Sequence, residues 1–190
     1  MVRAHLTETR MTRARAAFFD RDGVLNVDHG YTHRPEDLEF VPGAVAAVRR
    51  LNQAGWRVIV VTNQAGVARG YYDEAAVETF HAAMSAALAL EAARIDAFYY
   101  CPFHPEAEVE AYRHTDHPDR KPNPGMVLRA LADFGVAPDR AFLVGDRDSD
   151  LAAAARAGVR GYFYRGGDLD AFVQAVLVTE EGLERGIAGQ

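Results

Sequence analysis

The sequence contains one cysteine, Cys101, so no disulfide can form within the chain. It has no apolar run long enough to cross a membrane and no hydrophobic signal-peptide core near its N-terminus. It also lacks a basic stripe, and its net charge is −6. These absences argue against a disulfide-held secreted domain. They predict a cytoplasmic protein that binds neither membranes nor nucleic acids.

The 190 residues are the usual length of one domain, and the hydrophobic share of 49% suits a globular protein. The arginine-rich segment 1–15 has no clear periodicity, and we expect it to be a flexible leader. We expect the folded domain to span 16–178 and the acidic segment 179–190 to be a frayed tail. The small, loop-rich surface predicts a monomer.

Short apolar runs alternate along the chain with stretches that have apolar residues at helical spacing. The runs predict strands over 16–19, 56–61, 97–101, 141–144 and 160–164. The stretches between them predict helices over 43–54, 73–90, 125–134, 149–157 and 169–178. This alternation indicates an α/β fold, a Rossmann-like, doubly wound and mainly parallel sheet with helices on both faces. Only loops such as 27–42 and 102–124 remain, so no large cap domain is expected.

Two carboxylates, Asp20 and Asp22, follow the first predicted strand, and Gly23 lets the backbone turn directly after them. Alternation along an extended chain places both acids on one side. Ligands of open parallel sheets bind just outside the carboxyl ends of the strands. Two acids at that point suit Mg²⁺, which prefers one or two carboxylates together with substrate phosphate oxygens. A D-x-D pattern is common, however, and by itself also fits a solvated turn.

Three further segments place phosphate-binding groups at other strand ends. Thr62 and Asn63 come directly after the second predicted strand, and Asp146 lies just after the fourth. Arg120 and Lys121 lie in the loop after the third strand, where they offer cations to a phosphoryl group. Each segment alone also fits a simpler explanation: a helix cap, a turn or a solvated basic pair. Their common position at strand ends favours a phosphate site.

Four motifs, in order, resemble the haloacid dehalogenase (HAD) superfamily of phosphatases: D-R-D-G, V-V-T-N-Q, R-K-P-N-P-G-M and V-G-D-R-D-S-D. The segments N-V-D-H-G-Y, T-N-Q-A-G-V-A-R-G and Y-Y-C-P are similar, within that superfamily, to the D-glycero-D-manno-heptose 1,7-bisphosphate phosphatases. Histidinol-phosphate phosphatases share much of this pattern. The similarity runs from about residue 18 to residue 164.

The resemblance implies a Mg²⁺-dependent phosphatase that forms an aspartyl-phosphate. It implies that Asp20 is the nucleophile and Asp22 the general acid and base, while Thr62 and Lys121 stabilise the phosphoryl charge. The metal would be held by the Asp20 carboxylate, the Asp22 backbone carbonyl and Asp146. Asp150, in contrast, is expected to orient Lys121 or the groups around the metal.

The resemblance also implies that loops bind a small sugar phosphate. The substrate-binding residues that it implies are Asp28, His29, Gly30, Tyr31, Asn63, Gln64, Ala65, Arg120 and Arg147, with Arg120 a candidate for the second phosphate. A histidinol-phosphate or broad small-molecule phosphatase is an alternative. A receiver-like phosphoacceptor module, which also combines acids, Mg²⁺, a threonine and a lysine, is an alternative of another class.

Relatives in this subfamily often carry a structural zinc in the loop after the third strand, bound by Cys-x-His and Cys-x-Cys. Here the pattern is degenerate, because Phe103 occupies the histidine position. Zinc accepts sulfur, nitrogen and carboxylate ligands. The four candidate ligands are Cys101, His104, His117 and Asp119. A metal-free loop is the favoured interpretation, because one thiolate gives this set little affinity for zinc.

Overall fold

The computed structural model describes residues 14–188, so the leader predicted over 1–15 lies almost entirely outside the described residues. Its centre is a parallel five-stranded sheet with the order β3-β2-β1-β4-β5. The strands are β1 (Ala16–Phe19), β2 (Arg57–Asn63), β3 (Ala97–Cys101), β4 (Ala141–Gly145) and β5 (Arg160–Phe163). The predicted parallel α/β fold is confirmed, and no large cap covers the described part of the chain.

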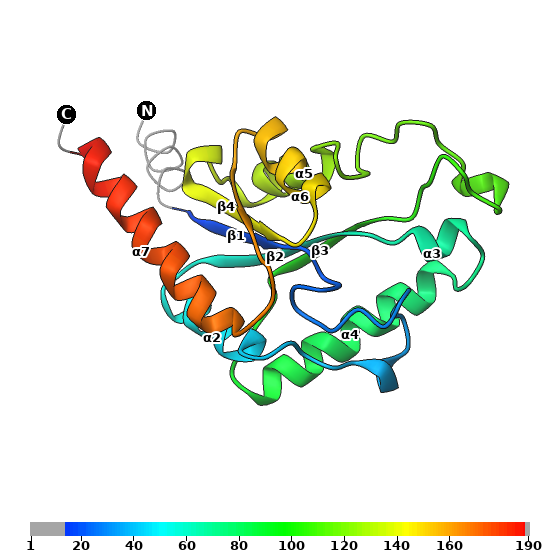
Figure 1. The fold of residues 1–190 in the computed structure, drawn as a ribbon, viewed down its shortest axis with the longest axis horizontal. Coiled ribbons are helices and arrows are strands. Elements are labelled where there is room, and N and C mark those ends of the chain that lie inside the picture. The colour runs from blue at the N-terminus through cyan, green and yellow to red at the C-terminus, as the bar shows by residue number, and fades with distance from the viewer. Residues whose placement is uncertain (1–13, 189–190) are drawn as a thin grey trace, which may run out of the picture.

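Helices cover both faces of the sheet (Figure 1). One face carries α2 (Ala44–Gln53), α4 (Glu74–Leu90) and α7 (Leu169–Ala188). The other carries α5 (Gly125–Phe134) and α6 (Asp148–Arg156). In β1, alternation sends Ala17 and Phe19 into the first core and Ala16 and Phe18 into the second. All four are fully buried, because a central parallel strand is covered on both sides.

The chain begins the sheet in its middle and then builds outward in both directions from β1. Phe19, the last residue of β1, pairs with Val60 of β2 and with Val144 of β4. The next residue, Asp20, donates its backbone N–H to the Val144 carbonyl at 3.0 Å. The change of direction therefore falls at β1, and a doubly wound sheet opens a crevice at such a point.

Strand β2 is longer at its end than the prediction, which stopped at Val61. Thr62 and Asn63 continue the ladder by pairing with Tyr100 and Cys101 of β3. Because β1 has already ended, these two polar residues project beyond it. The short helix α3 (Ala65–Ala68) follows, and its four residues are too few to show a helical period in the sequence.

The final helix, α7, continues to Ala188, past the predicted end at 178. The predicted tail over 179–190 is therefore helical over 179–188, and 189–190 lie outside the described residues. Glu180 explains the extension. Its buried carboxylate accepts hydrogen bonds from Arg160 Nε (2.7 Å), from Arg160 Nη2 and from the Tyr162 hydroxyl (2.7 Å). These contacts tie the helix to the edge strand β5.

Connections complete the fold. They include short 3₁₀ turns at η1 (Pro35–Asp37), η2 (Glu110–Tyr112) and η3 (Pro138–Arg140). Asp73 caps the N-terminus of α4, since its carboxylate accepts from the Ala76 N–H at 2.9 Å. Within residues 14–188, no helix has both the length and the apolar character needed to span a bilayer.

Candidate active site

A cavity of about 520 Å³ opens at the carboxyl ends of β1, β2 and β4. Twelve of the predicted site residues line it: Asp20, Asp22, Asp28, Gly30, Tyr31, Thr62, Asn63, Gln64, Ala65, Arg120, Lys121 and Arg147. They come from four separate segments of the chain. The parallel sheet brings them together, because its strands all end at one edge.

Lys121 lies at the floor of this cavity, between two carboxylates. Its Nζ is 2.9 Å from Asp20 Oδ1 and 2.7 Å from Asp150 Oδ1, and it donates to the Val61 carbonyl at 2.8 Å. Burial by itself would lower the pKa of Lys121, but the two carboxylates raise it above its ordinary value. The lysine is therefore a fixed positive charge beside Asp20.

The backbone of Lys121 is fixed as well. Asn63 Nδ2 donates to the Lys121 carbonyl at 2.9 Å, and the Lys121 N–H donates to Asn63 Oδ1 at 3.0 Å. This reciprocal pair uses one donor and one acceptor position of the Asn63 amide. These bonds join the loop after β3 to the end of β2 and so hold the Lys121 backbone next to the carboxyl end of that strand.

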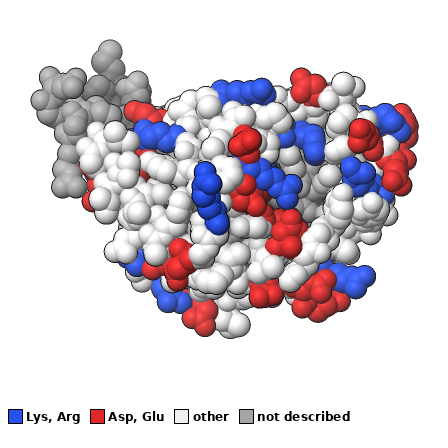
Figure 2. Space-filling view, in the orientation of Figure 1, with Lys and Arg blue, Asp and Glu red and all other residues white. Residues whose placement is uncertain are grey.

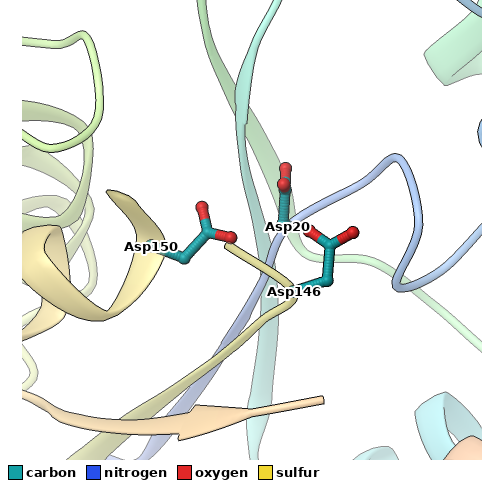
Figure 3. A group of neighbouring side chains, drawn as sticks. All are labelled: Asp20, Asp146 and Asp150. Atoms are coloured by element: carbon teal, nitrogen blue, oxygen red, sulfur yellow. The ribbon is translucent and has the colours of Figure 1, made fainter. Parts of the chain in front are cut away.

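Asp146 adds a third carboxylate at the end of β4, and Figure 3 shows it facing Asp20. One oxygen each of Asp20, Asp146 and Asp150 lie within 4.8 Å of one another. Burial and then repulsion from Asp20 raise the pKa of Asp146 to about 6. Asp146 Oδ1 is buried without a hydrogen-bond partner. Gly23 makes room for this residue, since a Cβ there would lie 2.3 Å from Asp146 Oδ2.

Closely placed carboxylates with an unused oxygen fit a hard divalent cation such as Mg²⁺. Asp20 and Asp146 supply the side-chain oxygens. Asp150 is already used, because Oδ1 pairs with Lys121 and Oδ2 accepts from the Arg147 N–H at 3.0 Å. That arrangement agrees with the expectation that Asp150 orients Lys121.

Of the predicted residues in the loop after β1, Asp28, Gly30 and Tyr31 line the cavity, and His29 does not. Asp28 Oδ2 accepts from Arg147 Nη2 at 3.2 Å across the opening. Tyr31 contacts Tyr71 edge-to-face, with ring centroids 4.8 Å apart. The Nε2 of His29 instead lies 3.4 Å from the Glu39 carboxylate, and both side chains are exposed.

The cavity wall also contains three residues that were not predicted from the sequence, Arg69, Tyr72 and Ser149, and one, His104, that was expected only as a zinc ligand. Arg69 lies inside the quoted segment T-N-Q-A-G-V-A-R-G, so a signal for it was present. Arg69 lies at the end of α3, one helical turn after Ala65, and this position could not be predicted without that helix. His104 enters the wall through the loop after β3, which has no period.

The four candidate zinc ligands do not come together as a group within the described chain. Cys101 Sγ lies 3.8 Å from His117 Nδ1, but His104 lines the cavity instead and Asp119 pairs with Arg129 at 2.8 Å. The ring of Phe103 stacks on His117 with centroids 4.1 Å apart. Phe103, at the position where the resemblance implied a histidine ligand, is therefore used for aromatic stacking.

Comparison with known proteins bears on this site. Residues 119–176 match the family described as "HAD-hyrolase-like". The D-glycero-beta-D-manno-heptose-1,7-bisphosphate 7-phosphatase of Rhodopseudomonas palustris is 44% identical over 167 residues, covering 87% of this chain and 92% of that protein. The enzyme of the same name from Escherichia coli K12 is 43% identical over 144 residues, covering 76% and 75%.

A solved structure is also similar. The D,D-heptose 1,7-bisphosphate phosphatase of B. bronchiseptica, complexed with magnesium and phosphate, has a TM-score of 0.75 and 32% identity, and the match covers 87% of this chain and 99% of that chain.

The parallel sheet and its carboxylate-lysine site define a phosphatase of the HAD superfamily, which is a phosphoric monoester hydrolase. Because the match covers 92% of the Rhodopseudomonas palustris enzyme and 75% of the Escherichia coli enzyme, the family can be assigned more narrowly. The chain belongs to the family of D-glycero-β-D-manno-heptose-1,7-bisphosphate 7-phosphatases.

Proposed function

We propose that this protein removes one phosphate from D-glycero-D-manno-heptose 1,7-bisphosphate in a Mg²⁺-dependent reaction. The observation that carries the proposal is the Asp20 carboxylate, 2.9 Å from the buried Lys121 ammonium at the floor of a cavity that Asp22 also lines. The names of the relatives supply the substrate. Phosphate monoesters require accelerations of up to about 10²¹-fold, which a cluster of fixed charges is suited to provide.

The residues support a two-step reaction. A carboxylate oxygen of Asp20 attacks phosphorus, and the bond from phosphorus to the sugar oxygen breaks. Asp22 gives its proton to the departing oxygen, so the sugar leaves as an alcohol. Asp22 then takes a proton from water, which attacks the phosphorus of the aspartyl-phosphate and regenerates Asp20. Lys121 and Thr62 stabilise the charge on the phosphoryl oxygens in both steps.

Asp20 and Asp146, with the backbone carbonyl of Asp22, would hold the Mg²⁺. When bound, the cation neutralises phosphoryl oxygens, so that an anionic nucleophile can approach an anionic substrate. Asp146 fits this role because its pKa is raised to about 6 and one of its oxygens has no hydrogen-bond partner.

The second phosphate is proposed to bind at Arg120. Its guanidinium is partly buried in the cavity wall and donates one hydrogen bond, to the Phe103 carbonyl at 3.1 Å. Burial, and after it the charge of nearby Arg69, lowers the pKa of Arg120. Two guanidinium groups that repel each other in one wall favour a dianion between them.

The test is phosphate release with Mg²⁺ from both anomers of heptose 1,7-bisphosphate, fructose 1,6-bisphosphate, histidinol phosphate and 4-nitrophenyl phosphate. We expect the highest kcat/KM for one heptose anomer. In Asp20→Asn we expect kcat to fall at least about 1,000-fold, because the nucleophile is lost.

Asp148→Asn is the matched control, since this acid is exposed on α6 and does not line the cavity. A higher kcat/KM for histidinol phosphate would contradict the substrate. Phosphate release that survives in Asp20→Asn would contradict the mechanism.

A further inference from the structure

Gln64 lies in the cavity wall, but its side chain is enclosed by the protein and the residue is only 1% exposed. Its Nε2 donates to Asp22 Oδ2 at 3.1 Å and to Thr62 Oγ1 at 2.9 Å. Its Oε1 accepts from the Tyr72 hydroxyl at 2.9 Å and from Arg21 Nη2 at 3.2 Å. The amide has two donors and two acceptor positions, and protein groups use all of them. Nothing remains for a sugar hydroxyl.

Arg21 is the second unusual residue, because its guanidinium is fully buried. Its Nη2 donates to Asp22 Oδ2 at 2.9 Å and to the Thr32 carbonyl at 2.6 Å, and Nε lies 3.1 Å from Asp22 Oδ1. Its Nη1 contacts His81 Nε2 at 3.2 Å, and its Cζ lies 4.6 Å from the Phe80 ring centroid. Burying a guanidinium is costly unless it is paired. Within the described chain, Asp22 is the one carboxylate that pairs with it.

Asp22 is held on one side and open on the other. Besides the two contacts above, Asn26 Nδ2 donates to its Oδ1 at 3.0 Å. The side chain is still 17% exposed, and the exposed part faces the cavity. Three neighbours, Arg21, Gln64 and Asn26, therefore hold this carboxylate in its direction.

We propose that Arg21 and Gln64 are positioning residues, which hold the Asp22 carboxyl group at the point where a leaving-group oxygen receives its proton. The proposal rests on the proposed function, in which Asp22 is the general acid. It changes the interpretation of Gln64 from a residue that binds the sugar to one that links Asp22 with Thr62. A proton donor must lie within hydrogen-bond reach of its acceptor, so its orientation controls the rate.

Comparing two leaving groups distinguishes a positioning role from a merely structural one, because a structural defect would lower kcat/KM for both. A sugar alkoxide leaves poorly without a proton, whereas 4-nitrophenolate is stable and leaves without one. The kcat/KM value reports the steps up to and including phosphoryl transfer. A misplaced Asp22 will therefore lower kcat/KM for the sugar phosphate and leave kcat/KM for 4-nitrophenyl phosphate nearly unchanged.

We would measure both values for Gln64→Leu and Arg21→Lys, with Asp22→Asn as the reference. For both positioning variants we expect a loss of roughly 10- to 100-fold on heptose 1,7-bisphosphate and a change below about threefold on 4-nitrophenyl phosphate. Lys keeps the charge of Arg21 but cannot form its bidentate contact. Should Arg21→Lys fail to fold, as judged by circular dichroism, Gln64→Leu decides the result.

His81→Gln is the control, because His81 contacts Arg21 without contacting Asp22, and glutamine keeps an acceptor there. Equal losses on both substrates, or no loss on either, would overturn the positioning role. If the wild-type protein releases no phosphate from heptose 1,7-bisphosphate, the proposed substrate is wrong. The same comparison is then made with whichever alkyl phosphate of the panel it hydrolyses.

Discussion

At the scale of single residues, Lys121 is the charge on which the site depends. It is 3% exposed and lies between Asp20 and Asp150, at 2.9 and 2.7 Å. Two buried carboxylates without this cation would repel each other in a medium that screens poorly. The same ammonium thus stabilises the folded protein and prepares Asp20 to meet a phosphate.

Lys121→Met should therefore remove both stability and activity. We expect the free energy of unfolding to fall by about 3–5 kcal/mol, because the change leaves buried charges without their partner. Urea denaturation measures this. Arg113→Met is the matched control, since it breaks an exposed ion pair with Glu110 and should cost less than about 1 kcal/mol. Equal stability of Lys121→Met and wild type would contradict this account.

At the scale of elements, α4 illustrates how a helix supports the site from behind. Its buried His81 stacks on Phe98 of β3, with ring centroids 4.3 Å apart, and contacts Arg21. Burial, and after it the charge of Arg21, lowers the pKa of His81 to about 3. The imidazole is therefore neutral in the folded protein near pH 5, where an unfolded chain would protonate it.

His81 should make the protein less stable in mild acid. In this pH range the unfolded chain binds a proton at His81 that the folded protein does not. The free energy of unfolding is therefore highest above pH 6.5 and decreases as the pH falls toward 3. Between pH 7 and pH 5 the loss from this residue is about 2 kcal/mol. Gln cannot be protonated, so His81→Gln should lose less stability over this range by that amount. Parallel pH curves from urea unfolding of the two proteins would rule this out.

At the scale of the whole molecule, α7 joins the edge strand β5 to the α2 side of the sheet (Figure 1). Glu180 makes this connection through Arg160 and Tyr162. Elsewhere the surface is mixed in charge, and Figure 2 shows acidic and basic side chains interspersed on one face. The net charge of −6 therefore does not prevent a local set of arginines from meeting an anion.

Glu180→Ala should loosen this connection. It leaves a guanidinium and a hydroxyl without their acceptor, and we expect a loss of about 2–4 kcal/mol in the free energy of unfolding. Thr179→Ala is the control on the same helix, because this exposed hydroxyl donates to the Ala175 carbonyl of its own helix at 3.1 Å. We expect it to change stability by less than about 0.5 kcal/mol. If Glu180→Ala has the same free energy of unfolding as the wild-type protein, the anchoring role is contradicted.

The sequence by itself determined the parallel sheet and the location of its site. Apolar runs specified the strands, and β1, β3 and α5 have the predicted bounds. Parallel strands end at one edge, so polar residues at their ends must meet whatever the order of the strands. Asp20 and Thr62 could therefore be placed in one cluster from their positions, whereas the role of Lys121, in the loop after β3, came from the family resemblance.

Only the tertiary structure decided which side chain contacts which. The enclosed amide of Gln64 and the contact of buried Arg21 with His81 depend on residues distant in sequence, and His29 lies beside Glu39 and not in the cavity wall. The contact of Glu180 on α7 with Arg160 of β5 likewise joins residues distant in sequence. Local patterns report burial and backbone period, whereas a charged or amide side chain is fixed by whichever partners the folded chain brings within about 3 Å.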